Sequence, residues 1–150
     1  MTMEISIATL DDVSQLCELL ELLFSQEAEF QADHAVQSVG LRQIIEQPER
    51  GQILVARDGS LLVGMVNLLF TVSTALGGRV AILEDMIVHP RGRGGGAGSL
   101  LLQAAINAAQ AAGCRRITLL TDCTNEAAQN FYQRHGFILS NMVPMRLMLI

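Results

Sequence analysis

A glycine-rich stretch, VHPRGRGGGAGSLLL from Val88 to Leu102, constrains the fold of this chain more than any other feature. It lies between a strongly apolar run and a leucine-rich segment with helical spacing. Glycines reach positive φ at little cost and place no Cβ between the backbone and a ligand. In the order strand, glycine loop and helix start, backbone N–H groups and the positive end of a helix dipole converge on an anion. The stretch therefore predicts a phosphate-binding turn; the alternative is a surface loop without a ligand.

Each part of this turn has an expected role. The guanidinium of Arg93 adds a charged fork, and Ser99 begins the helix. Closely spaced amides come from Gly94, Gly95, Gly96, Ala97 and Gly98.

Composition excludes several classes of protein. The 150 residues carry a net charge of −5, and all ten basic residues are arginine. Because there is no lysine, neither a P-loop lysine nor a lysine Schiff base is available. No basic tail or stripe is present to attract a nucleic-acid backbone, so we expect no nucleic-acid partner.

The cysteines and the apolar stretches favour a cytoplasmic protein. Cys17, Cys114 and Cys123 show no metal-ligand spacing with the three histidines, so we expect reduced thiols and no metal site. The first residues show no basic start followed by an apolar stretch and a small-residue cleavage site, so we expect no export signal. The long uncharged stretches 59–78 and 94–114 resolve into strand alternation and an amphipathic helix, so we expect no membrane segment.

The hydrophobic pattern predicts one domain over residues 1–150. Helices are expected from about Thr9 to Ser25, where Asp12 gives a helix-start signature, and from about Asp33 to Pro48. Strands are expected at 3–8, 51–57, 61–73, 79–88 and 115–121, with helices at 99–112 and 125–134 and a final hairpin from Phe137 to Ile150. The fold class is α/β (α+β): a mixed, mostly antiparallel sheet of about seven strands flanked by about four helices.

A dinucleotide-binding oxidoreductase is one alternative. Gly92-x-Gly94-x-x-Ala97 nominally fits the Rossmann fingerprint, and Asp122 follows the next strand. However, Asp122 lies 30 residues after Gly92, where about 20 are expected, and too few β-α units remain to complete a doubly wound half.

The glycine stretch resembles the first signature of the GNAT superfamily of acetyl-CoA-dependent N-acetyltransferases. In that family, a strand ending V-x-P precedes R-G-x-G-x-G-x-x-L-L, whose Arg-x-x-Gly-x-Gly core holds the pyrophosphate of coenzyme A. Here Val88-His89-Pro90 precedes Arg93-Gly94-Gly95-Gly96-Ala97-Gly98-Ser99-Leu100-Leu101. A second register from Arg91 also satisfies the core, but only the Arg93 register keeps the V-x-P spacing and the leucine pair. Gly92 stands where the family often has an aromatic residue or histidine.

Further motifs extend the resemblance over about residues 80–138. Asn125-x-x-Ala128-x-x-Phe131-Tyr132-x-x-x-Gly136-Phe137 is similar to the family's second signature. Ile82-Leu83-Glu84-Asp85 resembles the acidic start of the family's fourth strand. The resemblance implies a GNAT-like fold, acetyl-CoA as acyl donor, and direct transfer of acetyl to a primary amine of a small molecule in a ternary complex.

The resemblance also implies roles for individual residues. Tyr132, the only tyrosine, would donate a proton to the coenzyme A sulfur, although it could also be a core aromatic beside Phe131. Glu84 is the preferred base, directly or through water; strand alternation sends Asp85 to the opposite face unless a bulge intervenes. Backbone N–H groups near Ile87 and Val88 would stabilise the oxyanion. The expected acetyl-CoA contacts are Met86, Ile87, Val88, Arg93, Gly94, Gly95, Gly96, Ala97, Gly98, Ser99, Asn125, Ala128, Phe131 and Tyr132.

The acceptor is less clearly indicated. Acidic residues crowd the region that covers the acceptor site in this family, which favours a cationic amine, although a solvated helix face explains them nearly as well: Glu18, Glu21, Glu27, Glu29 and Asp33. A non-catalytic acyl-CoA sensor on the same fold is the second alternative. Apolar strands near the C-terminus, such as Met145 to Ile150, are compatible with a homodimer.

Overall fold

A computed structural model describes residues 3–26 and 31–150 of the chain. They form two compact units, Met1–Leu120 and Thr121–Ile150, each of which is described by itself. The expectation of a single domain over the whole chain stays a prediction.

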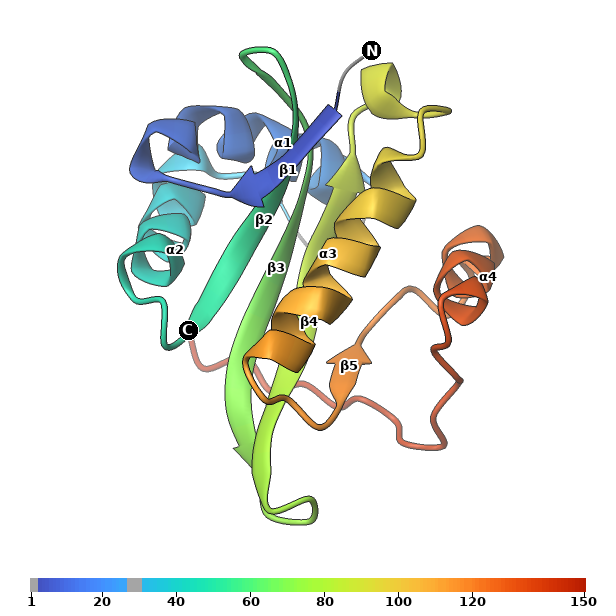
Figure 1. The fold of residues 1–150 in the computed structure, drawn as a ribbon. Helices are drawn as coiled ribbons and strands as arrows, with labels where there is room; N and C mark the ends of the chain where they lie inside the picture. The colour runs from blue at the N-terminus through green and yellow to red at the C-terminus, as the bar shows by residue number, and fades with distance from the viewer. Residues whose placement is uncertain (1–2, 27–30) are drawn as a thin grey trace. The chain divides into compact units, whose positions relative to one another are not determined.

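The first unit is built on a five-stranded sheet with the order β1-β2-β3-β4-β5 (Figure 1). Neighbours from β1 to β4 are antiparallel, and β5 pairs with β4 in parallel. The strands are β1 (Met3–Ile7), β2 (Gly51–Asp58), β3 (Leu61–Ser73), β4 (Gly78–Val88) and β5 (Ile117–Leu119). The order confirms the predicted antiparallel meander followed by one β-loop-α-β crossover.

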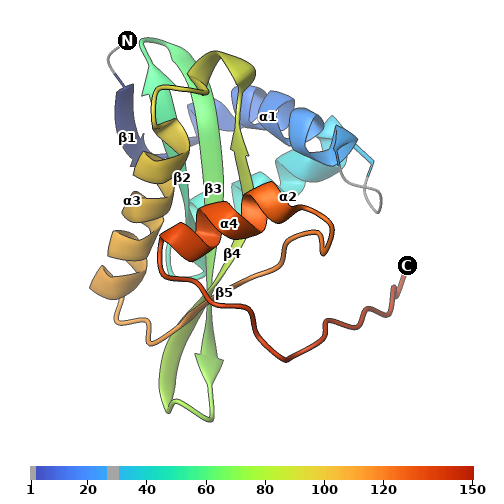
Figure 2. The ribbon, with the colours of Figure 1, turned by 90° about the vertical axis from the view of Figure 1, so that its right-hand side faces the viewer.

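Helices cover both faces of this sheet, as the edge-on view shows (Figure 2). On one face lie α1 (Val13–Ser25) and α2 (His34–Glu46), and on the other lies α3 (Ala97–Ala111). Leu16 of α1 and Leu41 of α2 share a buried core with Ile53, Met65 and Ile87 of the strands. Against the opposite face, α3 packs its small buried residues, such as Ala105 and Ala109.

The start of α1 is fixed by a buried carboxylate, and a short 3₁₀ turn, η1 (Leu10–Asp12), leads into the helix. Asp12 accepts a hydrogen bond from the backbone N–H of Thr9 at 2.9 Å, which confirms the predicted start signal. The guanidinium of Arg57 on β2 donates to both carboxylate oxygens of Asp12 at 3.0 Å. This bidentate ion pair therefore ties the first helix to the sheet.

The second unit contains α4 (Glu126–Arg134). Gly136 follows this helix with φ 98°, as expected of a left-handed C-cap. The backbone N–H of Phe137 donates to the carbonyl of Tyr132, and that of Gly136 donates to the carbonyl of Gln133. These two bonds form a Schellman motif, which closes the helix and brings Phe137 back against Tyr132.

The predicted strand count and the final hairpin are wrong. The sheet has five strands rather than about seven, and residues 138–150, including Met145 to Ile150, form no helix or strand. The strand predicted at 115–121 is only Ile117–Leu119. An apolar run indicates that a segment has strand propensity. A strand also needs a neighbouring strand whose backbone groups are in register with its own, and propensity does not show whether such a neighbour exists.

Candidate active site

A β-bulge interrupts β4 at the acidic pair. The ladder with β3 passes from Met65–Ile87 to Asn67–Glu84, so β4 uses one residue more than β3 over this interval. Asp85 lies in the extra stretch with φ 55°. A bulge changes the alternation of side chains, so Glu84 and Asp85 need not lie on opposite faces of the sheet.

The side chain of Asp85 reaches towards β3. The amide nitrogen of Asn67 donates to a carboxylate oxygen of Asp85 at 2.6 Å. Asn67 stands opposite Ile53 in the β2–β3 ladder, and Ile53 belongs to the core under α1 and α2. Residues directly opposite in a ladder share a face, so Asn67 holds Asp85 on the α1–α2 face. The buried amide of Asn67, which we did not expect, is thus one partner of Asp85; a backbone or arginine partner for this carboxylate stays a prediction.

Glu84 is exposed and is the ladder partner of Asn67. It therefore belongs to the same face as Asn67, beside Asp85. Both carboxylates of β4 thus meet on one side of the sheet. Asn67 was not predicted from the sequence, although an amide within the apolar run of β3 was a signal that could have found it.

The edge of β4 that faces β5 is open beyond Leu83. The parallel ladder runs only from Ala81–Ile117 to Leu83–Leu119. At the end of β4 the N–H of His89 donates to the carbonyl of Val63 at 2.7 Å, towards β3. Because backbone groups alternate along an antiparallel strand, the N–H of Ile87 points towards β3 and that of Val88 away from it. Of the two expected oxyanion donors, Val88 is therefore the one on the open side.

The glycine loop joins β4 to α3 as the spacing predicts. After the turn η2 (Pro90–Gly92), the Nε of Arg93 donates to the carbonyl of Val88 at 3.3 Å, so this side chain folds back over the end of the strand. Gly94 has φ 84°, and Gly96, the N-cap of α3, has φ 80°. No other atom lies within 4 Å of the place that a Cβ would take on either glycine.

The first turn of α3 has no side-chain cap. A glycine N-cap has no side-chain oxygen, so it cannot accept from the first N–H groups of the helix as Ser, Thr or Asp would. Ala97 is buried, Gly98 is half-buried, and Ser99 is exposed. The loop thus combines left-handed glycines, an arginine and uncapped helical amides, which suit an anion with several oxygens.

Gly92 has a packing role. A Cβ at this position would lie 3.1 Å from the Cβ of Val63 and 3.2 Å from a methyl of Val88. A larger side chain would therefore require the side chain of Val63 or Val88 to give by a few tenths of an ångström, and glycine avoids this.

The remaining expected contacts lie in the second unit. The side chain of Asn125 accepts from the N–H of Ala128 at 3.0 Å, which is the expected helix cap. Tyr132 is half-buried between Phe131 and Phe137, with ring centroids 5.3 Å and 5.8 Å away. Desolvation by burial raises the pKa of Tyr132 to about 12. The phenol therefore remains a proton donor throughout the physiological pH range.

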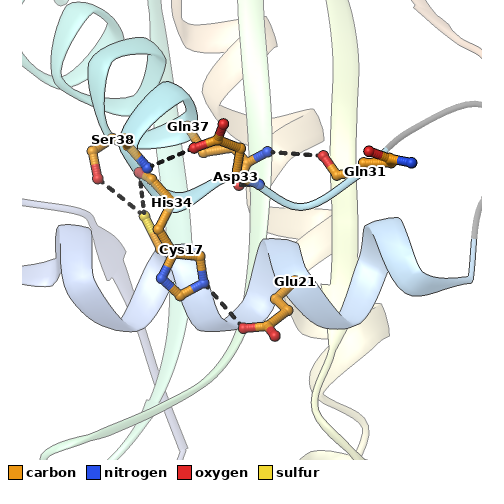
Figure 3. Close-up of polar contacts among 8 residues, drawn as sticks. Cys17, Glu21, Gln31, Asp33, His34, Gln37 and Ser38 are labelled. Carbon is orange, nitrogen blue, oxygen red and sulfur yellow. Dashed lines mark hydrogen bonds and ion pairs between the residues drawn. The ribbon is translucent and has the colours of Figure 1, made fainter.

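Two of the acidic residues that suggested a cationic acceptor, Glu21 and Asp33, make structural contacts (Figure 3). Glu21 pairs with the Nε2 of His34 at 3.0 Å, joining α1 to α2. The carboxylate of Asp33 accepts from the N–H groups of Ala35 and Val36 and so caps α2. Glu27 and Glu29 lie outside the described residues. Glu18 is exposed beside a cavity of about 190 Å³ that is also lined by Arg91, so this cavity carries both signs of charge.

We also examined the described residues for a metal centre and for a membrane-spanning helix. Among the described residues, no cluster of three or more histidine, cysteine or acidic side chains could hold a metal ion. No helix in the described ranges has both the length and the apolar character needed to span a bilayer.

Comparisons with known proteins agree with the geometry. The curated uncharacterized N-acetyltransferase YhfO of Bacillus subtilis (strain 168) is 35% identical over 85 residues, a match that spans 57% of each chain. An integron cassette protein from the mobile metagenome of Cole Harbour Salt Marsh has a similar crystal structure, with 26% identity, a TM-score of 0.84, and coverage of 97% of this chain and 90% of that one. A predicted acetyltransferase from Clostridium acetobutylicum, solved with acetyl-CoA, shares the fold at 17% identity, with a TM-score of 0.80 and coverage of 99% and 97%. The acetyltransferase (GNAT) family model matches residues 14–137, and the chain belongs to this family.

Proposed function

We propose that this protein is an N-acetyltransferase that moves the acetyl group of acetyl-CoA to a primary amine of a small molecule, by direct attack in a ternary complex. The loop from Arg93 to Ser99 carries the proposal, because left-handed glycines lead into a helix whose first amides have no side-chain cap. Such a loop suits the pyrophosphate of coenzyme A. The relative from Clostridium acetobutylicum that was solved with acetyl-CoA supports the same donor.

The open edge of β4 suits the thioester. In the proposed reaction the amine nitrogen attacks the thioester carbonyl carbon, and negative charge develops on its oxygen. A backbone N–H on the open side, such as that of Val88, would donate to this oxygen. Fixed donors of this kind stabilise a developing oxyanion without reorganising during the reaction.

Two proton transfers complete the proposed transfer. The amine gives up a proton to a base, for which Glu84 is the candidate because it is exposed on the α1–α2 face. When the carbon–sulfur bond breaks, the thiolate takes a proton from the phenol of Tyr132. A phenol with a pKa of about 12 is fully protonated at neutral pH and is therefore available for this step.

We infer that the acceptor is cationic in solution. Glu84 and Asp85 on one face of the sheet support this better than the acidic helices, because Glu21 and Asp33 are already engaged in local contacts. Both carboxylates would attract an ammonium group, and one of them would then accept its proton.

Two assays test the proposed function. Isothermal titration calorimetry with acetyl-CoA is expected to give one site per chain, and a thiol-release assay with a panel of amines is expected to show turnover. Polyamines or amino sugars should be better acceptors than acidic amines. Binding of acetyl-CoA without turnover on any amine would favour an acyl-CoA sensor instead, and absence of binding would exclude both.

A further inference from the structure

The amide of Asn67 is a costly feature in the middle of the sheet. The polar side chain of Asn67 is only 3% exposed, and its neighbours on β3, Val66 and Leu68, are fully buried apolar residues. Its nitrogen donates to Asp85, whereas its oxygen is buried and receives no hydrogen bond from the described protein atoms. A buried polar atom without a partner destabilises the folded state, because it has lost its hydrogen bonds to water. An apolar residue would pack here at lower cost, so stability alone does not account for the amide.

The residue that Asn67 holds is itself in an unfavourable conformation. Asp85 is the only non-glycine residue with positive φ in the described ranges. The left-handed conformation is unfavourable for an L-residue with a Cβ, although aspartate tolerates it better than most residues. Strained residues of this kind cluster at functional sites, where the surrounding structure maintains them.

The chemistry of the pair fixes the direction of the hydrogen bond. A carboxylate accepts only, so the amide nitrogen of Asn67, not its oxygen, must face Asp85. The bond draws the carboxylate of Asp85 to the α1–α2 face, where Glu84 is the ladder partner of Asn67.

We propose that Asn67 is a positioning residue for the acceptor site: its amide fixes the carboxylate of Asp85 beside Glu84, and Asp85 then accepts a hydrogen bond from the ammonium group of the acceptor. The inference rests on the proposed acetyltransferase function and assigns different roles to the two carboxylates. Asp85 orients the amine, while Glu84 takes its proton. Asn67 acts only through Asp85 and does not touch the substrate.

The first test removes the donor and keeps the number of side-chain heavy atoms. Asn67→Leu is expected to raise the KM for the amine about tenfold, since it removes a hydrogen bond to a charged group. The Kd for acetyl-CoA, measured by calorimetry, should stay within about twofold, because the loop from Arg93 to Ser99 does not involve Asn67. Urea unfolding should show at most a small loss of stability, because removal of the unpaired oxygen offsets the larger volume of leucine.

Two further variants separate positioning from a structural role. Asp85→Asn keeps a residue that tolerates positive φ and leaves the buried site unchanged, and it should raise the KM as much as Asn67→Leu does. The exchange Asn67→Asp with Asp85→Asn restores an amide–carboxylate pair with its polarity reversed. It should recover stability relative to Asn67→Asp alone, but not the KM, because the carboxylate is now buried on β3.

The outcomes distinguish this inference from the proposed function. If the wild-type chain acetylates amines and either single variant leaves the KM unchanged, Asn67 is not a positioning residue. If the exchanged pair recovers the KM, the contact is structural. If the wild-type chain binds acetyl-CoA but acetylates no amine, the proposed function fails and this inference fails with it.

Discussion

Tyr132 is the residue whose chemistry the sequence and the structure describe most fully. It is the only tyrosine of a chain without tryptophan, so its ionisation dominates the absorbance change at alkaline pH. Burial raises its pKa to about 12, from an ordinary value of 10.0. An absorbance titration of the folded protein should therefore have its midpoint near pH 12, moving to about 10 in concentrated denaturant.

Far-UV circular dichroism at each pH shows whether the chain is still folded during this titration. A midpoint near the ordinary value in the folded protein would contradict the burial of Tyr132. The proposed role as proton donor is tested separately by Tyr132→Phe. This variant should lower kcat by a factor of about 10²–10⁴ and leave the Kd for acetyl-CoA nearly unchanged.

The ion pair of Asp12 and Arg57 makes stability depend on pH. The guanidinium of Arg57 hydrogen-bonds the carboxylate of Asp12 and holds the pKa of Asp12 below its ordinary value of 3.8. A lowered carboxylate pKa stabilises the folded state above the unfolded pKa, and this contribution is lost as the pH falls through the folded pKa. The free energy of unfolding should therefore decrease below about pH 4.

Asp12→Asn should remove this part of the pH dependence and cost about 3 kcal/mol at neutral pH, because it leaves Arg57 without its charged partner. The neighbouring Asp11 is exposed, so Asp11→Asn is a matched control with an expected effect within about 0.5 kcal/mol. Urea unfolding from about pH 3 to 7 measures both variants. An equal slope with pH for the wild type and Asp12→Asn would show that the pair does not act in this way.

At the scale of elements, the loop before α3 depends on backbone conformation. Gly94 and Gly96 have positive φ, and a Cβ on either would lie in open space, so alanine there meets no atoms and is unfavourable only through its dihedral angle. Each substitution should destabilise the chain by about 1 kcal/mol and, by moving the amides, weaken acetyl-CoA binding about tenfold or more.

The matched control is Gly40→Ala in the interior of α2, where a Cβ also meets nothing within 4 Å. Here φ is helical, so alanine should raise the free energy of unfolding by about 0.5–1 kcal/mol with no effect on binding. Calorimetry and urea unfolding of the three variants give the comparison. Unchanged acetyl-CoA affinity in both loop variants would remove the loop from the binding site.

Helices and strands were easier to predict where they are formed by interactions between residues that are close together in the sequence. The starts and ends of α1, α2 and α4 were predicted to within a few residues because Asp12, Asp33, Asn125 and Gly136 act on backbone groups next to them. The bulge at Asp85 and its bond to Asn67 depend on register between two strands, which periodicity does not encode. The same reason explains the failure of the predicted hairpin beyond Phe137.

At the scale of the whole molecule, the order of strands and helices was predictable because turn signals and one glycine loop allow few connections. The site was predictable in part. The loop between β4 and α3 was predicted from local sequence, because the spacing of its glycines indicates the backbone conformation, whereas the roles proposed for Glu84 to Ser99 stay predictions. Asn67 was not predicted, because it is 18 residues from the carboxylate that it holds. Residues that act through a partner on another strand have no signature in a single sequence.

The uncapped first turn of α3 has a consequence for mutagenesis. Its proposed ligand contacts are main-chain amides, which every ordinary substitution leaves chemically intact, so a conventional alanine scan would record the exposed Ser99 as dispensable. Proline is the exception, because it lacks the amide hydrogen and the opening turn of a helix tolerates it. Ligand binding by main-chain amides is not affected when a side chain is removed. It is detected only by substitutions that change the peptide group itself.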